Sequence, residues 1–300
     1  MTNMCTQPNY AMYIKPSNPE EKGHLKFILK LDTNFRSLKQ RYGDFLISLP
    51  CGKCEECRKN YATEWATRCE LEARKSKGKN WFITLTYDNK HMPKDGRLKK
   101  EDIQEFIDLL VNDGIKGHAT KKKDFKYWIA GEYGPLTNRP HYHGIIFNLE
   151  LKDIKSAGII GKVPVFESEK IRKAWKNGYY VLEEANGKAA AYCAKYANKS
   201  SGMNFRPLMS KGLGLEELYK EKDFIIKYGY IQGANGRKLK IPRYFYKKFI
   251  EDQLVQQRKM EQIQIGIERT SELQRFEPLE KKLKEKDILH KKQKGRRSKI

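Results

Sequence analysis

Two histidines separated by one residue stand in the stretch RPHYHGIIF, at residues 139–147. The apolar residues that follow them predict a β-strand, in which alternate side chains point to the same face. His141 and His143 therefore share a face, and two imidazoles one pleat apart can bind one divalent ion. Ordinary polar side chains at the mouth of a sheet are the alternative interpretation.

A carboxylate ends the preceding strand, FKYWIAGE at residues 125–132. The loop between the two strands contains Gly-Pro and predicts a hairpin, which would bring Glu132 toward His141. Two imidazoles and a carboxylate leave positions open on a six-coordinate ion, which suits Mg²⁺ or Mn²⁺ acting on a phosphate. Without the histidines, Glu132 would be interpreted as a charge at the mouth of a hairpin.

The stretch GKAAAYCAKYANK, at residues 187–199, contains a second group of reactive side chains. Its alanines favour a helix, on which Tyr192 and Tyr196 share one face, because they are four residues apart. Lys195 and Lys199 are related in the same way. A tyrosine hydroxyl has a free pKa of ~10 and becomes a useful nucleophile when a metal and lysines neutralise the phosphate that it attacks. The alternative is a helix that packs its tyrosines on a sheet and exposes its lysines.

Three cysteines, Cys51, Cys54 and Cys57, form a CxxCxxC pattern just before a long helix. Structural zinc takes four ligands, so Cys69 or Cys5 would have to complete such a site. Buried thiols are the alternative. Six cysteines in 300 residues are too few for a disulfide scaffold, so thiols or metal ligands are expected.

The elements that must position these residues follow the order β-α-β-β-α-β. Periodicity and capping signals predict helices at residues 99–113 and 168–178, and strands at residues 81–88, 125–132, 141–148 and 179–184. This is the split-βαβ, ferredoxin-like order, an α+β fold with an antiparallel sheet. Its two helices are expected on one face, which would leave the other face free to work.

Three regions are expected along the chain. An N-terminal segment, residues 1–78, is irregular except for a short strand at 44–50 and a long helix at 55–77. A core at residues 79–200 carries the histidines and tyrosines. A C-terminal extension, residues 201–300, is expected to contain a hairpin turning at Asn-Gly, further helix, and a basic tail.

The charge balance indicates the kind of partner. The chain has 61 Lys and Arg against 37 Asp and Glu, a net charge of +24, and so positive a surface attracts polyanions such as nucleic acid. No apolar run approaches the ~18 residues of a membrane-spanning helix, and the N-terminus has no signal peptide pattern. A soluble, intracellular protein without a membrane partner is therefore expected.

Three of these stretches together resemble the motifs of one enzyme superfamily. FITLTYD, GEYGPLTNRPHYHGIIF and YCAKYANK look like the three motifs of HUH-type rolling-circle replication initiators. The resemblance is strongest to the replication initiators of Microviridae phages, especially the gokushovirus branch. The leader PCGKCEECRKNYATEWATRCELEA also resembles the pattern of that branch. The resemblance covers about residues 49–200.

The resemblance implies roles for individual residues. His141 and His143 match the paired metal-binding histidines, and Glu132 matches a third ligand of related viral initiators. The remaining matches are the twin catalytic tyrosines Tyr192 and Tyr196 and the basic residues Lys195 and Lys199. Thr84 and Thr86 belong to the first motif, which resembles a structural strand.

The resemblance also implies an activity, in the host cytoplasm. Such an initiator binds the origin of the double-stranded replicative form, nicks one strand through a phosphotyrosine, and later cleaves and ligates to release a single-stranded circle. Host helicase and polymerase would be its partners. A plasmid-type initiator or relaxase would use the same chemistry. A non-catalytic module like the RRM is a further alternative, but the RRM's RNP1 pattern does not occur in this sequence.

Overall fold

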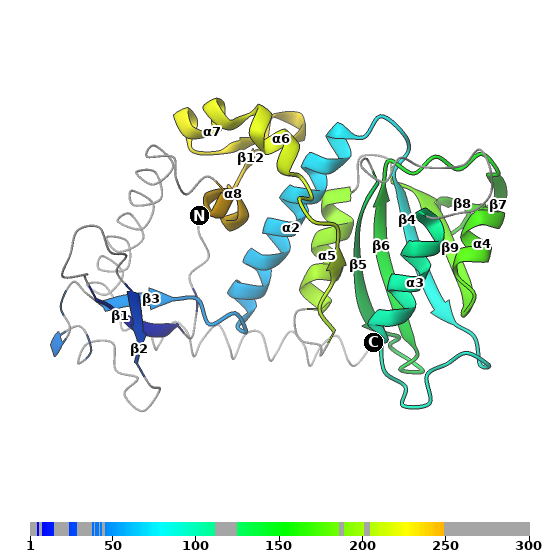
Figure 1. The fold of residues 1–300 in the computed structure, drawn as a ribbon, viewed down its shortest axis with the longest axis horizontal. Helices are drawn as coiled ribbons and strands as arrows, with labels where there is room; N and C mark the ends of the chain where they lie inside the picture. Colours follow the sequence, from blue (N-terminus) through cyan, green and yellow to red (C-terminus); the bar gives the residue numbers. More distant parts are fainter. Residues whose placement is uncertain are drawn as a thin grey trace. The chain divides into compact units, whose positions relative to one another are not determined.

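A computed structural model describes residues 5, 8–14, 24–28, 38, 40–41, 43, 46–111, 125–185, 189–200 and 205–248 (Figure 1). The chain divides into two compact units. The second comprises Phe224–Gly229 and the residues from Arg243 onward. It contains α8 (Arg243–Lys248) and most of α7 (Lys222–Tyr228). Every other element belongs to the first unit, and the region boundaries expected at residues 78 and 200 remain predictions.

A small sheet stands near the N-terminus. Its strands are β1 (Asn9–Ile14), β2 (His24–Phe27) and β3 (Leu46–Leu49), antiparallel in the order β2-β1-β3. β3 confirms the strand expected at residues 44–50. The expectation that the chain before it is irregular is wrong, because β1 and β2 exist. Both depend on pairing with strands distant in sequence, which no local pattern indicates.

The long helix α2 (Glu55–Lys75) confirms the helix expected at residues 55–77. Acidic residues occupy its first turn and basic residues its last turn, which matches the helix dipole. α2 packs along a second helix, α5 (Ala189–Ser200), which carries the two tyrosines (Figure 1). The sequence had indicated both helices but not that they pack together.

Four antiparallel strands form the centre of the large sheet, in the order β5-β6-β4-β9. They are β4 (Trp81–Tyr87), β5 (Lys126–Tyr133), β6 (Pro140–Phe147) and β9 (Gly178–Glu184). All four confirm the expected strands, and the fold is α+β with an antiparallel sheet, as predicted. The connecting helices are α3 (Lys100–Val111) and α4 (Glu169–Ala174). α4 begins at Ser168, whose hydroxyl accepts a hydrogen bond from the amide of Ile171.

Three further strands, which the sequence pattern did not indicate, widen the sheet. The hairpin β7 (Lys155–Ile160) and β8 (Val163–Glu167) joins the β9 edge, and β10 (Leu208–Met209) joins β5. Every residue of β7 is exposed. A strand without a buried face shows no alternation of apolar and polar residues, which explains why this one was missed.

Helices cover both faces of the sheet, so the expectation of one open face is wrong. On one face α3 and α4 pack against the strands, with a core that includes Phe106, Tyr142, Ile146, Ile171 and Trp175. On the other face lies α5, with α2 beside it (Figure 1). α5 buries Cys193, Tyr196 and Ala197 against the sheet, an apolar face that had to be removed from water.

The chain after α5 confirms the sequence expectations where it is described. The helix α6 (Leu215–Lys220) follows, and then β11 (Ile231–Gln232) and β12 (Lys238–Leu239) pair across the short helix η2 (Ala234–Gly236), which contains the expected Asn-Gly turn. The helix expected from residue 251, the basic tail at 291–300, and residues 112 and 113 of the expected first core helix lie outside the described residues. Among the helices of the described part, none is both long and apolar enough to cross a membrane.

The tyrosine between the two histidines points to the opposite face of the sheet. The Tyr142 hydroxyl donates to the carbonyl oxygen of Lys99 at 2.8 Å and accepts from the Lys99 amide at 2.6 Å. It lies 2.8 Å from the hydroxyl of Tyr87, which donates to Asp102. Tyr142 thereby fastens β6 to the start of α3 and to β4.

We expect Tyr142→Phe to lower the free energy of unfolding by about 1–3 kcal/mol, because the buried polar groups of Lys99 lose their partner. Denaturant unfolding monitored by circular dichroism measures this. Tyr179→Phe is the matched control, since Tyr179 is 69% exposed. Equal stability losses in the two variants would contradict this account of Tyr142.

Candidate functional site

Two threonines on β4 hold the two histidines on β6. In the pairing of these strands Thr84 lies opposite His143, and Thr86 lies opposite His141. The Thr84 hydroxyl is 3.0 Å from Nδ1 of His143, and the Thr86 hydroxyl is 2.9 Å from Nδ1 of His141. The first motif, to which sequence analysis assigned only a structural strand, thus contacts both imidazoles directly.

These hydrogen bonds occupy the same ring nitrogen, Nδ1, on both histidines. If each Nδ1 carries the proton and donates it to its threonine, each Nε2 keeps a lone pair for a metal ion. Sequence analysis missed this role of Thr84 and Thr86. The signal was present, because both the threonines and the histidines repeat with the two-residue period of a strand.

Glu132 on β5 completes the group. Its backbone is paired with that of His141, as the predicted hairpin requires, but its carboxylate lies closest to the other histidine. Oε2 of Glu132 is 3.4 Å from Nε2 of His143, and both side chains are largely buried. The hairpin therefore does bring the acid to the histidine pair, and the contact is made with His143.

A glycine leaves space beside the other histidine. The backbone of Gly134 follows β5, and its amide donates to the carbonyl oxygen of Arg139 at 2.9 Å. A Cβ at Gly134 would lie 2.8 Å from Nε2 of His141, closer than side-chain carbons approach other atoms. The room at this nitrogen therefore depends on the glycine.

The spacing within the group is wider than a shared ion requires. The ring centroids of His141 and His143 are 6.4 Å apart. Within the described part of the chain, only one group, made of cysteines, brings three or more ligand atoms within 4.8 Å of one another. One ion could contact His141, His143 and Glu132 together only if His141 moved toward the other two.

The tyrosine helix lies directly over the histidines. The ring of Tyr196 stacks on that of His143, with centroids 4.0 Å apart and planes inclined by 16°. The ring of Tyr192 stacks on Phe82 at 4.1 Å, and its hydroxyl donates to the carbonyl oxygen of Ile83 at 3.4 Å. The two tyrosine rings are 4.7 Å apart. Tyr196 is thus the tyrosine that contacts the histidine pair.

Burial governs the protonation of these groups. It raises the pKa of Tyr192 well above its usual value, and the neighbouring Tyr196 adds to the effect. Burial lowers the pKa of His141, although Glu132 opposes the shift, so the neutral imidazole is favoured. Nζ of Lys195 lies 4.9 Å from the ring centroid of Tyr196. The side chain of Lys199 lies outside the described residues.

The cysteines separate into two groups. Cys51, Cys54 and Cys57 lie together, and the fourth member of their group is Cys5. The expectation that Cys69 completes the group is therefore wrong. Cys69 is fully buried on the inner face of α2, where its thiol lies beside that of Cys193 on α5. A residue several turns along α2 points away from the start of the helix, where the other cysteines are.

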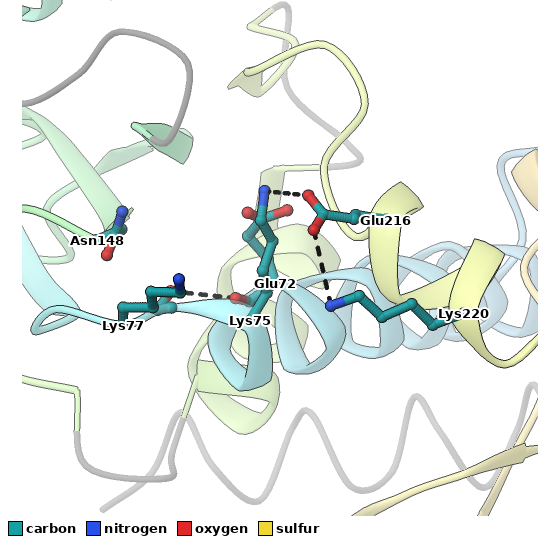
Figure 2. A pocket seen from close by; sticks show the side chains of 7 residues that line it. Glu72, Lys75, Lys77, Asn148, Glu216 and Lys220 are labelled. Carbon is teal, nitrogen blue, oxygen red and sulfur yellow. Dashed lines mark hydrogen bonds and ion pairs between the residues drawn. The ribbon is translucent and has the colours of Figure 1, made fainter.

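A separate hollow lies between the end of α2 and α6 (Figure 2). Its charged residues are already matched, because Lys75 contacts Glu216 at 2.5 Å and Lys220 contacts the same carboxylate at 3.7 Å. Glu72 accepts a hydrogen bond from the amide of Gly214. None of the histidines or tyrosines lines this hollow, whose ion pairs hold α6 to α2.

We expect both histidines to carry their proton on Nδ1 when neutral. Long-range ¹H–¹⁵N correlation spectra of the imidazoles distinguish the two tautomers. Thr84→Val should shift His143 toward the Nε2-protonated form and leave His141 unchanged, and Thr86→Val should do the reverse. Nε2-protonated histidines in the unaltered protein would contradict this assignment.

Comparison with known proteins shows the family. A family model described as replication-associated protein ORF2 matches residues 80–201. Replication-associated protein ORF2 of Spiroplasma virus 4 is 31% identical over 216 residues, which are 66% of each chain. Replication-associated protein VP4 of Bdellovibrio phage phiMH2K is 33% identical over 219 residues, covering 67% of this chain and 68% of the relative.

Replication-associated protein ORF4 of Chlamydia phage 1 is 31% identical over 67% of this chain and 53% of its own length. This chain thus spans about two thirds of the first two relatives and about half of the third. No solved structure matches the chain. The resemblance to Microviridae initiators is confirmed, and the chain belongs to the family of phage replication-associated proteins.

Proposed function

We propose that this replication-associated protein nicks one strand of the phage origin through a tyrosine and later rejoins the strand into a circle. The contact of Tyr196 with His143 is the observation that carries the proposal. A nucleophile and a metal-ligand type from two motifs 53 residues apart in the chain meet face to face only because α5 covers the sheet (His143 and Tyr196, by their numbers).

The order of the core elements supports an HUH-type, ferredoxin-like core. The four central strands, taken in chain order, stand in the sheet as second, third, first and fourth. The two helices that connect them pack on the same face. This is the arrangement that the split-βαβ order produces. The hairpin β7–β8 and the short strand β10 are additions at the edges.

His141, His143 and Glu132 fit a divalent cation in donor type. Their threonine partners leave both Nε2 atoms available, and Gly134 leaves space beside one of them. These three residues would hold Mg²⁺ or Mn²⁺, with His141 moving inward as the ion binds. When bound, such an ion would withdraw electron density from the oxygens of the scissile phosphodiester.

The tyrosines then supply the covalent step. The phenolic oxygen of one tyrosine attacks phosphorus and loses its proton to solvent, while the 3′-oxygen leaves and takes up a proton. One P–O bond forms and one breaks, so the phosphotyrosine conserves the bond energy and rejoining needs no ATP. A second tyrosine four residues away can repeat the step on the regenerated origin, and the new 3′-hydroxyl then displaces the first tyrosine.

Positive charge supports DNA as the substrate. The net charge of +24 favours binding to phosphates, with an affinity that falls steeply as salt rises. Lys195 adds a cation beside Tyr196, where a phosphate would approach. The free 3′-end would prime a host polymerase, and a host helicase would separate the strands ahead of it.

We expect wild-type protein, Mn²⁺ and single-stranded origin oligonucleotide to form a protein–DNA adduct that survives denaturation. Tyr196→Phe and Tyr192→Phe should each reduce the adduct, and the double variant should form none, because no phenol remains to accept the phosphoryl group. Tyr219→Phe, on the exposed surface of α6, is the control. Gel electrophoresis of labelled oligonucleotides provides the measurement.

Two outcomes would refute this proposal. One is wild-type protein that forms no adduct with any oligonucleotide tiling both strands of its own phage genome. The other is an adduct that persists at full yield in the double variant. A protein that retains DNA affinity in either case would be a binding module.

We expect Gly134→Ala to raise the Mn²⁺ concentration for half-maximal cleavage by about tenfold, because its methyl group occupies the space beside Nε2 of His141. His141→Ala should abolish cleavage at every Mn²⁺ concentration. Leu136→Ala is the matched control, since Leu136 lies in the same loop and is 96% exposed. An unchanged Mn²⁺ dependence in Gly134→Ala would exclude His141 as a ligand.

A further inference from the structure

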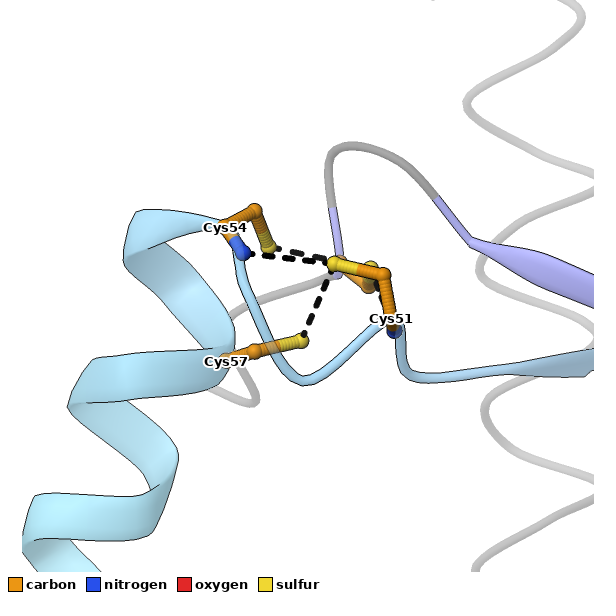
Figure 3. Close-up of side chains that lie close together, drawn as sticks. Cys51, Cys54 and Cys57 are labelled. Carbon is orange, nitrogen blue, oxygen red and sulfur yellow. Dashed lines mark hydrogen bonds between the residues drawn. The ribbon is translucent and has the colours of Figure 1, made fainter. Parts of the chain in front are cut away.

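Four sulfur atoms meet at the start of α2, away from the histidines and tyrosines (Figure 3). They belong to Cys5, near the N-terminus, and to Cys51, Cys54 and Cys57. All four ligand atoms lie within 4.8 Å of one another. All six cysteines of the chain are among the described residues, and none forms a disulfide. The structure thus gathers thiols that lie up to 52 residues apart (Cys5 and Cys57, by their numbers).

The distances between these sulfurs match one tetrahedral ion. Four thiolates about 2.3 Å from a zinc ion stand about 3.8 Å from one another, the edge of the tetrahedron. Sγ of Cys51 is 3.9 Å from Sγ of Cys57, and Sγ of Cys54 is 3.7 Å from Sγ of Cys5. The arrangement therefore has the size of a four-thiolate zinc site.

Backbone amides point at the sulfurs, as they do where thiols are ionised. The amides of Lys53 and Cys54 lie 3.4 and 3.2 Å from Sγ of Cys51, and the amide of Cys51 lies 3.3 Å from Sγ of Cys5. Amide donors stabilise negative charge on sulfur, and metal-bound cysteines are thiolates. Half of the cluster thus has donors suited to the charged form.

Gly52 makes this turn possible. Its φ is +75°, in the left-handed region that side chains disfavour, and this conformation turns the next two amides back toward Cys51. No atom approaches the position that a Cβ would take at Gly52, so backbone conformation is the reason for a glycine there.

We propose that Cys5, Cys51, Cys54 and Cys57 bind one structural zinc ion. The ion ties the N-terminal segment to the first turn of α2, and α2 packs along the tyrosine helix α5. Cys69 of α2 meets Cys193 of α5 further along that contact. The zinc site would fix one end of the helix that supports α5, without touching the proposed reaction.

Other sulfur chemistry fits the geometry less well. A disulfide needs sulfurs about 2.05 Å apart, well below the spacing of either close pair. In an iron–sulfur cluster each cysteine binds a different iron, which spreads the thiolates beyond the separation required by a single ion. A single ion shared by all four is the arrangement that the spacing favours.

The decisive experiment is elemental analysis of the full chain purified without chelator. We expect one zinc per chain. Cys5→Ala should lose most of that zinc, whereas Cys69→Ala should retain it, because only Cys5 belongs to the cluster. These two variants are a matched pair, since they distinguish the fourth ligand proposed here from the alternative that the sequence left open.

A second measurement does not depend on the folding of a variant. Wild-type protein refolded with Co²⁺ in place of zinc should show sulfur-to-cobalt charge-transfer absorption and the intense visible bands of a tetrahedral thiolate site. Wild-type protein that holds neither zinc nor cobalt, stoichiometric iron in place of zinc, or paired disulfides under reducing purification would each overturn the proposal. Because these readouts do not involve DNA, they stand or fall separately from the nicking reaction.

Discussion

The pairing of β4 with β6 is the constraint on which the rest of the site depends. It places Thr84 against His143 and Thr86 against His141, so that one ladder of backbone hydrogen bonds orients both imidazoles. A slip of one residue would turn all four side chains to the opposite face. Tyr142 opposes such a slip, because its hydroxyl is satisfied by Lys99 on the other side of the sheet.

The packing of α5 places the tyrosines but also opposes their ionisation. The helix buries apolar residues against the sheet, and this burial brings Tyr196 onto His143. The same burial raises the pKa of Tyr192 and so favours its neutral phenol. A reaction at phosphorus therefore needs charge that a bound ion and Lys195 would contribute, since the protein interior alone stabilises the unreactive form.

The sequence predicted those parts of the fold that have a local signal. β4, β5, β6, β9, α2 and α3 were expected near their observed bounds, because each buries one face and shows the matching period. β7 was missed because all its residues are exposed, and β1 because its partners are distant. The open face was a wrong expectation, because the order of elements does not reveal that a later helix returns to cover the sheet.

The sequence by itself determined which side chains share a face. His141 with His143 follows from the period of a strand, and Tyr192 with Tyr196 from that of a helix. Only the tertiary structure decided which faces meet: Tyr196 with His143, Glu132 with His143 rather than His141, and Cys5 rather than Cys69 with the CxxCxxC group. Periodicity is a property of neighbouring residues, whereas these contacts depend on how distant elements pack.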